Sequence, residues 1–191
     1  MQTLQLSEKL ILLGIDTQRG SLVTTHLGMV YSLSGILLYE LIKQNKIKID
    51  DNNKLNIVSS GRNDNPMHNL ALELIAQDKK ARKLSFWISR LARNGRKIQN
   101  YYIRQLIEKR ILEQKEQRTL WIFKSKRYPI VNIKHKDELI RTLKDFIQYE
   151  SNLSDDMTLL VCLSYTCNLL RQIFLEKDGL RNAKHKIKNL I

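Results

Sequence analysis

The stretch that decides the fold is residues 27–46, LGMVYSLSGILLYELIKQNK. Its leucines at 33, 37, 38 and 41 recur at three- and four-residue steps, which places them on one face of a helix. The stretch contains no proline, so nothing in it breaks the helix. Its apolar window ends near Leu41, well short of the about 20 apolar residues that cross a bilayer. We therefore predict a core helix here and expect any membrane role of the protein to be peripheral.

Working outward from this helix, most of the chain carries helical patterns, and few prolines or glycines interrupt them. Ser7 is the predicted N-cap of the first helix, and Gly14 is its predicted end. Alternating apolar residues predict a hairpin over residues 47–58. Further helices are predicted at 67–78, 84–92, 96–111, 137–149 and 157–175, with a basic tail or helix at 178–191. The predicted fold class is mainly α, a helical core with small β-hairpins in a single domain over residues 1–191.

The charge of the chain is its strongest compositional signal. Lys and Arg total 33 against 19 Asp and Glu, so the net charge is +14. Residues 1–75 carry equal numbers of basic and acidic side chains, and the whole excess therefore lies in residues 76–191. A basic half is typical of proteins that bind nucleic acid or anionic lipid, although a solvated basic surface has the same composition.

Catalytic and metal-binding patterns are weak. The chain has no glycine-rich phosphate loop, and its four histidines have no ligand spacing. Cys162 and Cys167 lie in an apolar stretch, which predicts reduced thiols and a cytoplasmic protein. Asp155 and Asp156 precede an apolar helix and are expected to interact with its dipole. We therefore predict a protein that is not an enzyme, with no catalytic residue, no metal and no cofactor.

Basic side chains cluster on both sides of the predicted break at Asn94-Gly95. Arg93, Arg96 and Lys97 can converge where one helix ends and the next begins, with Arg90 beside them. Converging guanidinium groups offer forked donors together with charge, which is what a phosphate group requires. The lipid- or anion-binding site is predicted at Arg93, Arg96 and Lys97. The alternative is an ordinary solvated helix face.

A second candidate surface is the predicted strand at residues 119–123, preceded by a turn at 114–117 and followed by a return over 124–130. Its predicted tip is apolar and aromatic, and lysines follow it. Such a tip can enter a membrane interface, mediate self-association, or be a buried core strand. The tip residues are Leu120, Trp121, Ile122 and Phe123.

A helix followed by a basic hairpin is also typical of a winged-helix DNA-binding domain. In that interpretation Arg104, Lys109 and Arg110 lie on the recognition helix, and the protein is a nucleic-acid-binding regulator. About sixty further residues of largely helical sequence disfavour this alternative, because a small winged helix does not need them.

The order of several segments resembles the Golgi phosphoprotein 3 family. These segments are LSEKLILLGID at 6–16, RGSL at 19–22, GILLYEL at 35–41, IRQLIEKRIL at 103–112 and the apolar helix at 159–174. The resemblance implies a mostly helical single domain that binds phosphatidylinositol 4-phosphate on the cytosolic face of a membrane. It also implies an adaptor that contacts the cytosolic tails of glycosyltransferases and self-associates through its hairpin. A further alternative, from the charge alone, is a protein-interaction adaptor whose basic face meets acidic protein tails. The absence of a long polar amino-terminal extension suggests a compact, bacterial-type relative.

The headgroup site of that family carries over only in part. The four positions that the resemblance assigns to it fall here on Thr25, Ser34, Arg96 and Gln99, and only Arg96 is basic. The glycine that follows the family's Glu-Lys or Glu-Arg pair is Arg110 here. We therefore expect a peripheral membrane protein that binds phosphoinositide or other anionic phospholipid headgroups. Thr25, Ser34 and Gln99 depart from the family's site.

Overall fold

The structure, a computed structural model, describes residues 3–119, 123–149 and 154–189. Within these residues the chain is mainly α with small antiparallel sheets, which confirms the predicted fold class. The helices are α1 (Leu6–Gly14), α2 (His26–Lys43), α3 (Pro66–Ala76), α4 (Leu84–Ala92), α5 (Gly95–Glu108), α6 (Lys134–Tyr149), α7 (Asp155–Thr166), α8 (Leu170–Ile173) and α9 (Lys177–Lys188). The strands are β1 (Ile47–Ile49), β2 (Lys54–Ile57), β3 (Arg82–Lys83), β4 (Lys115–Thr119) and β5 (Phe123–Arg127).

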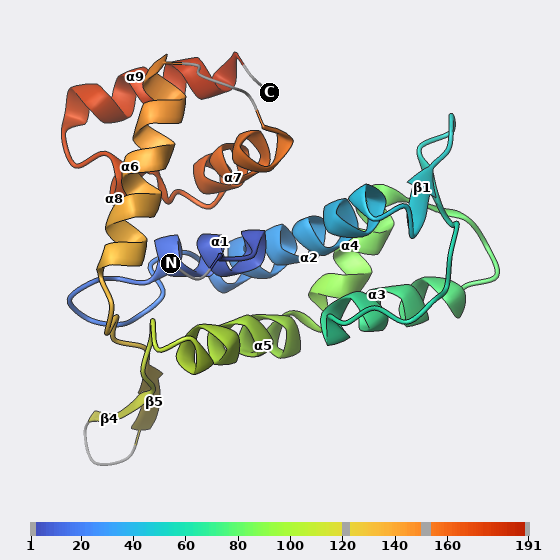
Figure 1. Ribbon diagram of the computed structural model, residues 1–191, viewed down its shortest axis with the longest axis horizontal. Coiled ribbons are helices and arrows are strands. Elements are labelled where there is room, and N and C mark those ends of the chain that lie inside the picture. The colour runs from blue at the N-terminus through green and yellow to red at the C-terminus, as the bar shows by residue number, and fades with distance from the viewer. Residues whose placement is uncertain (1–2, 120–122, 150–153, 190–191) are drawn as a thin grey trace. The chain divides into compact units, whose positions relative to one another are not determined.

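The chain forms two compact units, which can be followed by residue number in Figure 1. The first unit comprises residues 1–28 and 102–191, and the second comprises residues 29–101. The chain passes into the second unit near the start of α2 and returns to the first within α5. The single domain expected over residues 1–191 stays a prediction.

The core of the second unit is formed by the apolar face of α2, the β1–β2 hairpin, α3 and α4. Leu38 and Leu41 of α2 pack with Ile47 of β1, Leu55 of β2 and Trp87 of α4. Every one of these five side chains is almost completely buried. The leucine spacing in residues 27–46 therefore predicts the buried face of α2, because helical neighbours three and four residues apart share one side.

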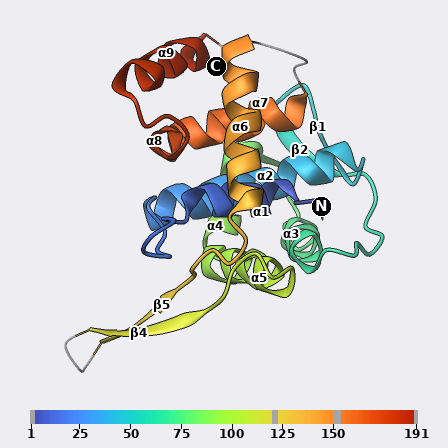
Figure 2. The same ribbon diagram turned by 60° about the vertical axis from the view of Figure 1, so that its left-hand side comes forward.

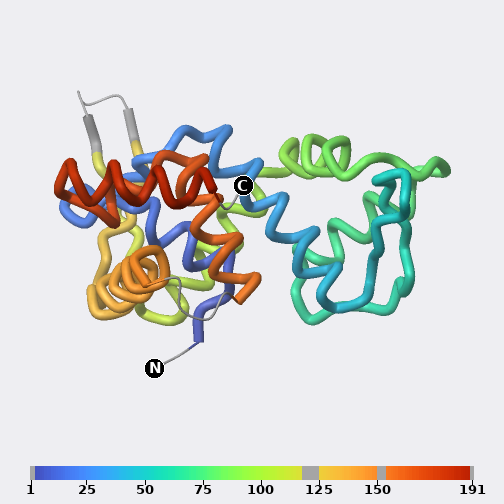
Figure 3. The backbone as a smooth tube through the Cα atoms, turned by 90° about the horizontal axis from the view of Figure 1, so that it is seen from above, coloured from blue at the N-terminus to red at the C-terminus, as the bar shows by residue number. Residues whose placement is uncertain are grey.

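The sheet of the second unit has one strand more than the sequence pattern predicts. β1 and β2 pair antiparallel, which confirms the hairpin over residues 47–58, and Figure 3 traces α2 into this hairpin and on to α3. β3 then pairs with β2, placing Arg82 beside Leu55. The sequence pattern predicts no strand between the helices expected at 67–78 and 84–92, whereas the structure has β3 there. Backbone pairing needs only an extended partner, and charged side chains do not prevent it.

The first unit packs its helices around α6. This helix contacts α1, α7, α8 and α9, and both ribbon views show it among them (Figures 1 and 2). α1 is buried on almost all sides, including Leu10 and Leu13. Apart from Ser7, Glu8 and Lys9, the residues of this helix are apolar, which favours a position inside the protein.

The turn after α1 depends on a close backbone approach. Gly20 has a φ of 62°, and its carbonyl accepts a hydrogen bond from the backbone N–H of Tyr128 at 2.6 Å. A Cβ at this position would lie 2.7 Å from the backbone nitrogen of Pro129. Only glycine satisfies both conditions, so the turn at residues 16–20 is anchored against the return of the hairpin.

The hairpin of residues 115–127 extends from the helices in Figure 2. Its pairing runs from Lys115 opposite Arg127 to Thr119 opposite Phe123. The turn predicted at 114–117 is wrong, because residues 115–117 belong to β4. The single strand predicted at 119–123 is also wrong, because Thr119 ends β4 and Phe123 begins β5. Of the predicted tip, residues 120–122 lie outside the described residues, and Phe123 is described only through its backbone pairing. The described strands carry charged and polar residues, so their pairing follows from the backbone more than from an apolar pattern.

Several helix ends differ from prediction. α1 begins at Leu6 after Gln5, whose backbone N–H donates to the Glu8 carboxylate, so Ser7 lies inside the helix and is not its cap. α5 ends at Glu108, before Arg110 with its φ of 56°. The single helix predicted at 157–175 is split into α7 and α8 by Asn168, whose φ is 57°. A residue in the left-handed region ends a helix, and sequence periodicity does not reveal it.

Candidate functional site

The α4–α5 corner brings together the three cations predicted from the sequence. Arg93 follows the last residue of α4, and Arg96 and Lys97 stand in the first turn of α5. All three side chains are exposed to solvent. Asn94 closes the joint, because its N–H donates to the carbonyl of Leu91 at 2.8 Å while its own carbonyl accepts from Ile98. The three charges therefore lie within five residues at one bend of the backbone.

The bend is held in place by a close contact at its glycine. A Cβ on Gly95 would lie 2.4 Å from the Cβ of Val30, which belongs to α2 in the same unit. Leu91 before the bend and Ile98 after it are both fully buried. The corner is thus fixed by packing on its inner side, and its cations are left on the outer side.

The charges of this corner are not neutralised within the protein. Among the residues that the structure describes, no carboxylate forms an ion pair with Arg93, Arg96 or Lys97. Asp78, an acid of the same unit, instead binds Arg82 at 3.2 Å. Unpaired cations at one bend attract an external anion, and they do so without first breaking an internal pair.

Arg90 does not belong with these three cations. It is partly buried, and its guanidinium lies 6.0 Å from the centre of the Trp87 ring. A cation over an indole is held by the ring's electron density, so Arg90 is engaged with the protein itself. The sequence pattern places Arg90 beside Arg93, but it does not distinguish an arginine that packs on the protein from one that is free to bind an anion.

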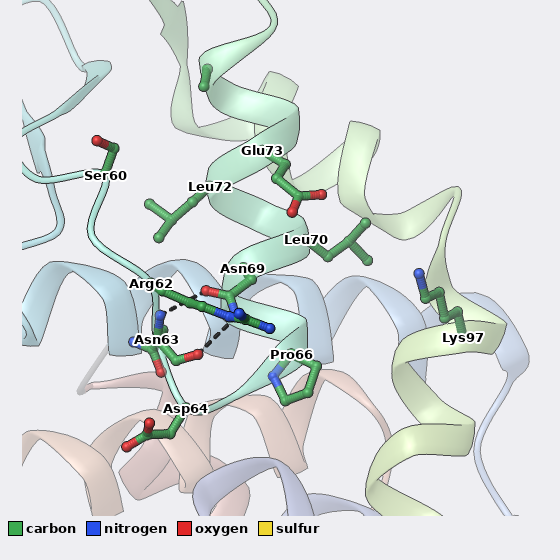
Figure 4. Close-up of a pocket in the computed structure, with 11 residues that line it drawn as sticks. Ser60, Arg62, Asn63, Asp64, Pro66, Asn69, Leu70, Leu72, Glu73 and Lys97 are labelled. Atoms are coloured by element: carbon green, nitrogen blue, oxygen red, sulfur yellow. Dashed lines mark hydrogen bonds between the residues drawn. The ribbon is translucent and has the colours of Figure 1, made fainter.

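A cavity of the second unit adds a residue that sequence reasoning missed. This cavity, of about 850 Å³, lies between the loop of residues 60–64, α3 and Lys97. Figure 4 shows Arg62 extending from the loop beneath α3, and Lys97 extending from α5. No ion pair of Arg62 is found in the described part of the chain. No sequence pattern predicts that Arg62 and Lys97 line one cavity. The two residues are far apart in the chain, and only folding brings the loop of Arg62 close to Lys97.

The loop that carries Arg62 is held by a pair of asparagines. The side-chain oxygen of Asn69 accepts from the backbone N–H of Asn63 at 2.8 Å, and its amide donates to the carbonyl of Asn63 at 2.7 Å (Figure 4). Asn65 then caps α3 by accepting from Met67 at 2.9 Å. Because the loop is ordered before any ligand arrives, binding here loses less conformational freedom. The cavity also holds the carboxylates of Asp64 and Glu73, so its charge is mixed.

The three positions that depart from the family's site have local roles. Thr25 caps α2, and its hydroxyl accepts from the N–H of Gly28 at 3.1 Å. Ser34 is fully buried, and its hydroxyl donates to the carbonyl of Val30 at 2.7 Å. Gln99 is half-buried, with a side-chain oxygen that has no hydrogen-bond partner in the described residues. Ser34 is therefore occupied inside its own helix and does not replace an arginine.

Of the three cations of the winged-helix alternative, Arg104 and Arg110 are exposed, and Lys109 is engaged within the protein. Lys109 pairs with the fully buried Glu8 at 2.7 Å. Ile103 and Leu106 of the supposed recognition helix are buried. A helix that enters a DNA groove must expose its reading face, and here one of the three predicted cations is bound inside the protein.

Further observations concern metals, cysteines and membrane spans. In residues 3–119, 123–149 and 154–189, no three His, Cys, Asp or Glu side chains come together as a metal site. Cys162 and Cys167 are both free, and Cys167 is buried. The described helices include none that is both long enough and apolar enough to cross a bilayer.

The comparison with protein families agrees with the fold and with the order of the segments. The sequence model of the family described as Golgi phosphoprotein 3 (GPP34) matches residues 6–191, which is almost the whole chain. The chain belongs to this family. No curated protein matches the sequence.

Proposed function

We propose that the protein is a non-catalytic peripheral membrane module that binds anionic phospholipid headgroups, including phosphoinositides, through Arg93, Arg96 and Lys97. One observation carries the proposal: three exposed cations meet at a rigid helix corner, and no described carboxylate neutralises them. Family membership supports it, since the chain belongs to a family of Golgi phosphoproteins. The module would act in the cytoplasm as an adaptor between a membrane and protein tails.

The strength of such binding follows from surface electrostatics. Each basic residue near an anionic leaflet contributes about 1 kcal/mol at physiological ionic strength. Three residues then give about 3 kcal/mol, which corresponds to roughly a hundredfold preference for anionic over neutral vesicles. Attraction of this size is reversible and suits a protein that docks on a surface and leaves again.

The test is co-sedimentation of the protein with three kinds of vesicle. One kind is neutral phosphatidylcholine, one contains phosphatidylglycerol, and one contains phosphatidylinositol 4-phosphate at matched charge. Binding to both anionic kinds indicates a surface driven by charge, and binding only to the third indicates headgroup recognition. Binding to neither anionic kind contradicts the proposal.

The residues are tested by a triple substitution with a control of equal charge. Replacing Arg93, Arg96 and Lys97 with Ala is expected to abolish vesicle binding while leaving the helical circular-dichroism signal intact. The control replaces Arg141, Arg171 and Lys177, which are exposed in the first unit, and loses the same charge. If the two variants bind vesicles equally well, the site is not at the α4–α5 corner.

A further inference from the structure

We propose that the solvent-facing side of α4, centred on Phe86, enters the interfacial layer of an anionic bilayer. This surface, the α4 face, consists of Phe86, Ser89 and Arg93 along the helix, together with Arg82 of β3, which lies against the Phe86 ring. The inference rests on the proposed headgroup function and names the element that meets the membrane.

Helical geometry puts these residues together. Phe86, Ser89 and Arg93 are spaced by three and four residues, so they share one side of α4. All three are exposed, with Phe86 38% accessible, whereas Trp87 and Leu91 on the opposite side are buried in the core. Arg93 thus belongs both to the α4 face and to the cations of the α4–α5 corner.

Phe86 is held in place by its neighbours. The guanidinium of Arg82 lies 5.1 Å from the centre of its ring, and the Trp87 ring stands beside it at 5.2 Å and 85°. Arg82 is itself fixed by Asp78 at 3.2 Å. Because the guanidinium covers one face of the Phe86 ring, that face cannot stack on a nucleic-acid base. Transfer of the ring's hydrocarbon edge out of water is still favourable.

The charge around Phe86 identifies the occupant. Residues 78–97 contain eight basic side chains and one acidic side chain, Asp78. A soluble anion would be held by the cations alone, and an exposed phenylalanine among them would add nothing. A bilayer offers an apolar layer directly beneath an anionic one, so Phe86 can enter the first while the arginines remain at the level of the phosphates.

A fluorescent reporter tests whether residue 86 enters the bilayer. The chain has two tryptophans, Trp87 and Trp121, so Trp121→Phe leaves only the buried one as background. In that protein Phe86→Trp is expected to show a blue shift and quenching by brominated acyl chains when vesicles of phosphatidylcholine and phosphatidylglycerol are added. The matched reporter Leu175→Trp, at a position 89% exposed in the first unit, is expected to show neither.

The outcomes separate this inference from the headgroup function. If vesicles co-sediment with the protein but the tryptophan introduced at 86 keeps its emission and is not quenched, the headgroup function stands and the α4 face is overturned. If the protein binds no anionic vesicle, the headgroup function and the membrane insertion of the α4 face are both contradicted.

Affinity supplies a second measurement that involves no change of charge. Phe86→Ala is expected to weaken vesicle binding about three- to tenfold, because the ring that enters the bilayer is lost. The affinity should still fall with rising salt concentration at the same slope, because no charge has changed. Phe86→Leu is expected to retain most of the affinity, and Ser89→Ala on the same face all of it. Thermal unfolding shows whether each variant is folded. A folded Phe86→Ala protein that binds as tightly as its parent overturns the inference.

Discussion

Glu8 and Lys109 show how single buried charges organise the first unit. The Glu8 carboxylate is fully buried, and it accepts from the backbone N–H of Gln5 and from the Lys109 ammonium, both at 2.7 Å. A carboxylate that has left water must be paired, and Lys109 is its ionic partner. The pair joins the start of α1 to the end of α5. Lys109, which the sequence pattern suggests as a DNA-contacting residue, therefore stabilises the fold instead.

Lys136 is a second buried charge, on the first turn of α6. Its side chain is 1% exposed, and its ammonium donates to the carbonyl of Ile15. Burial lowers the pKa of Lys136 from 10.5 to about 8, although the carboxylates of Asp16 and Asp137 favour the charged form and partly oppose this. The folded protein therefore releases this proton more readily than the unfolded chain does.

The stability of the protein should consequently rise with pH in a defined window. Between pH 8 and 10.5 the unfolded chain holds a proton on Lys136 that the folded protein has lost. From pH 7 to pH 10 this site adds about 2–3 kcal/mol to the free energy of unfolding. Urea denaturation at both pH values should show the increase in the parent and its loss in Lys136→Met. Equal pH dependence in the two proteins contradicts the assignment.

At the scale of elements, the end of α5 is set by one strained residue. Arg110 has a φ of 56°, and around it the N–H groups of Arg110 and Ile111 donate to the carbonyls of Ile107 and Leu106. This left-handed position is the one where the family resemblance places a glycine. A residue with a Cβ is disfavoured there by about 1–2 kcal/mol, so this chain keeps its helix end at a cost in stability.

Arg110→Gly should therefore stabilise the protein by about 1 kcal/mol, because the strain of the left-handed backbone is removed. Arg104→Gly is the matched control. It removes the same side chain within the regular part of α5, and it should destabilise by about 1 kcal/mol. Thermal and urea unfolding of both variants measure these changes. Two changes of the same sign would mean that φ at Arg110 is not the cause.

The α4–α5 corner depends on another glycine. Gly95→Ala should destabilise the protein by about 1–3 kcal/mol, because the new Cβ meets Val30, although alanine favours the helix. Val30→Ala made together with it should recover only part of the loss, since it removes both methyl groups of Val30 but leaves its Cβ close to the new one. Denaturant unfolding of the single and double variants checks this coupling. Strictly additive effects would show that the two residues do not collide.

At the scale of the whole molecule, the net charge of +14 governs how the protein meets surfaces. Raising the salt concentration shortens the range of these charges from about 10 Å at 0.1 M to about 3 Å at 1 M. Binding to vesicles that contain phosphatidylglycerol should therefore weaken more than tenfold over this range, as measured by co-sedimentation. Affinity that is unchanged by salt would mean that apolar insertion alone holds the protein on the membrane.

How far the sequence predicts each part depends on whether its cause is local. The helices around Leu38, Trp87 and Pro66 follow from apolar spacing and a helix-opening proline, and the structure confirms them. The break at Asn168 does not, because a left-handed backbone depends on the packing of both helix ends. β3 was missed for a similar reason, since its two charged residues become a strand only when β2 is beside them.

The sequence by itself determined the helical class, the buried face of α2, the excess of positive charge and the order of segments that marks the family. These properties are set by neighbours along the chain, within a few residues of one another. Only the tertiary structure decided which cations are free. Lys109 meets Glu8 about a hundred residues away, Arg62 comes to share a cavity with Lys97, and Arg93 remains exposed at a corner closed by Gly95. Charge is a property of the residue, but its availability depends on what the fold brings within reach.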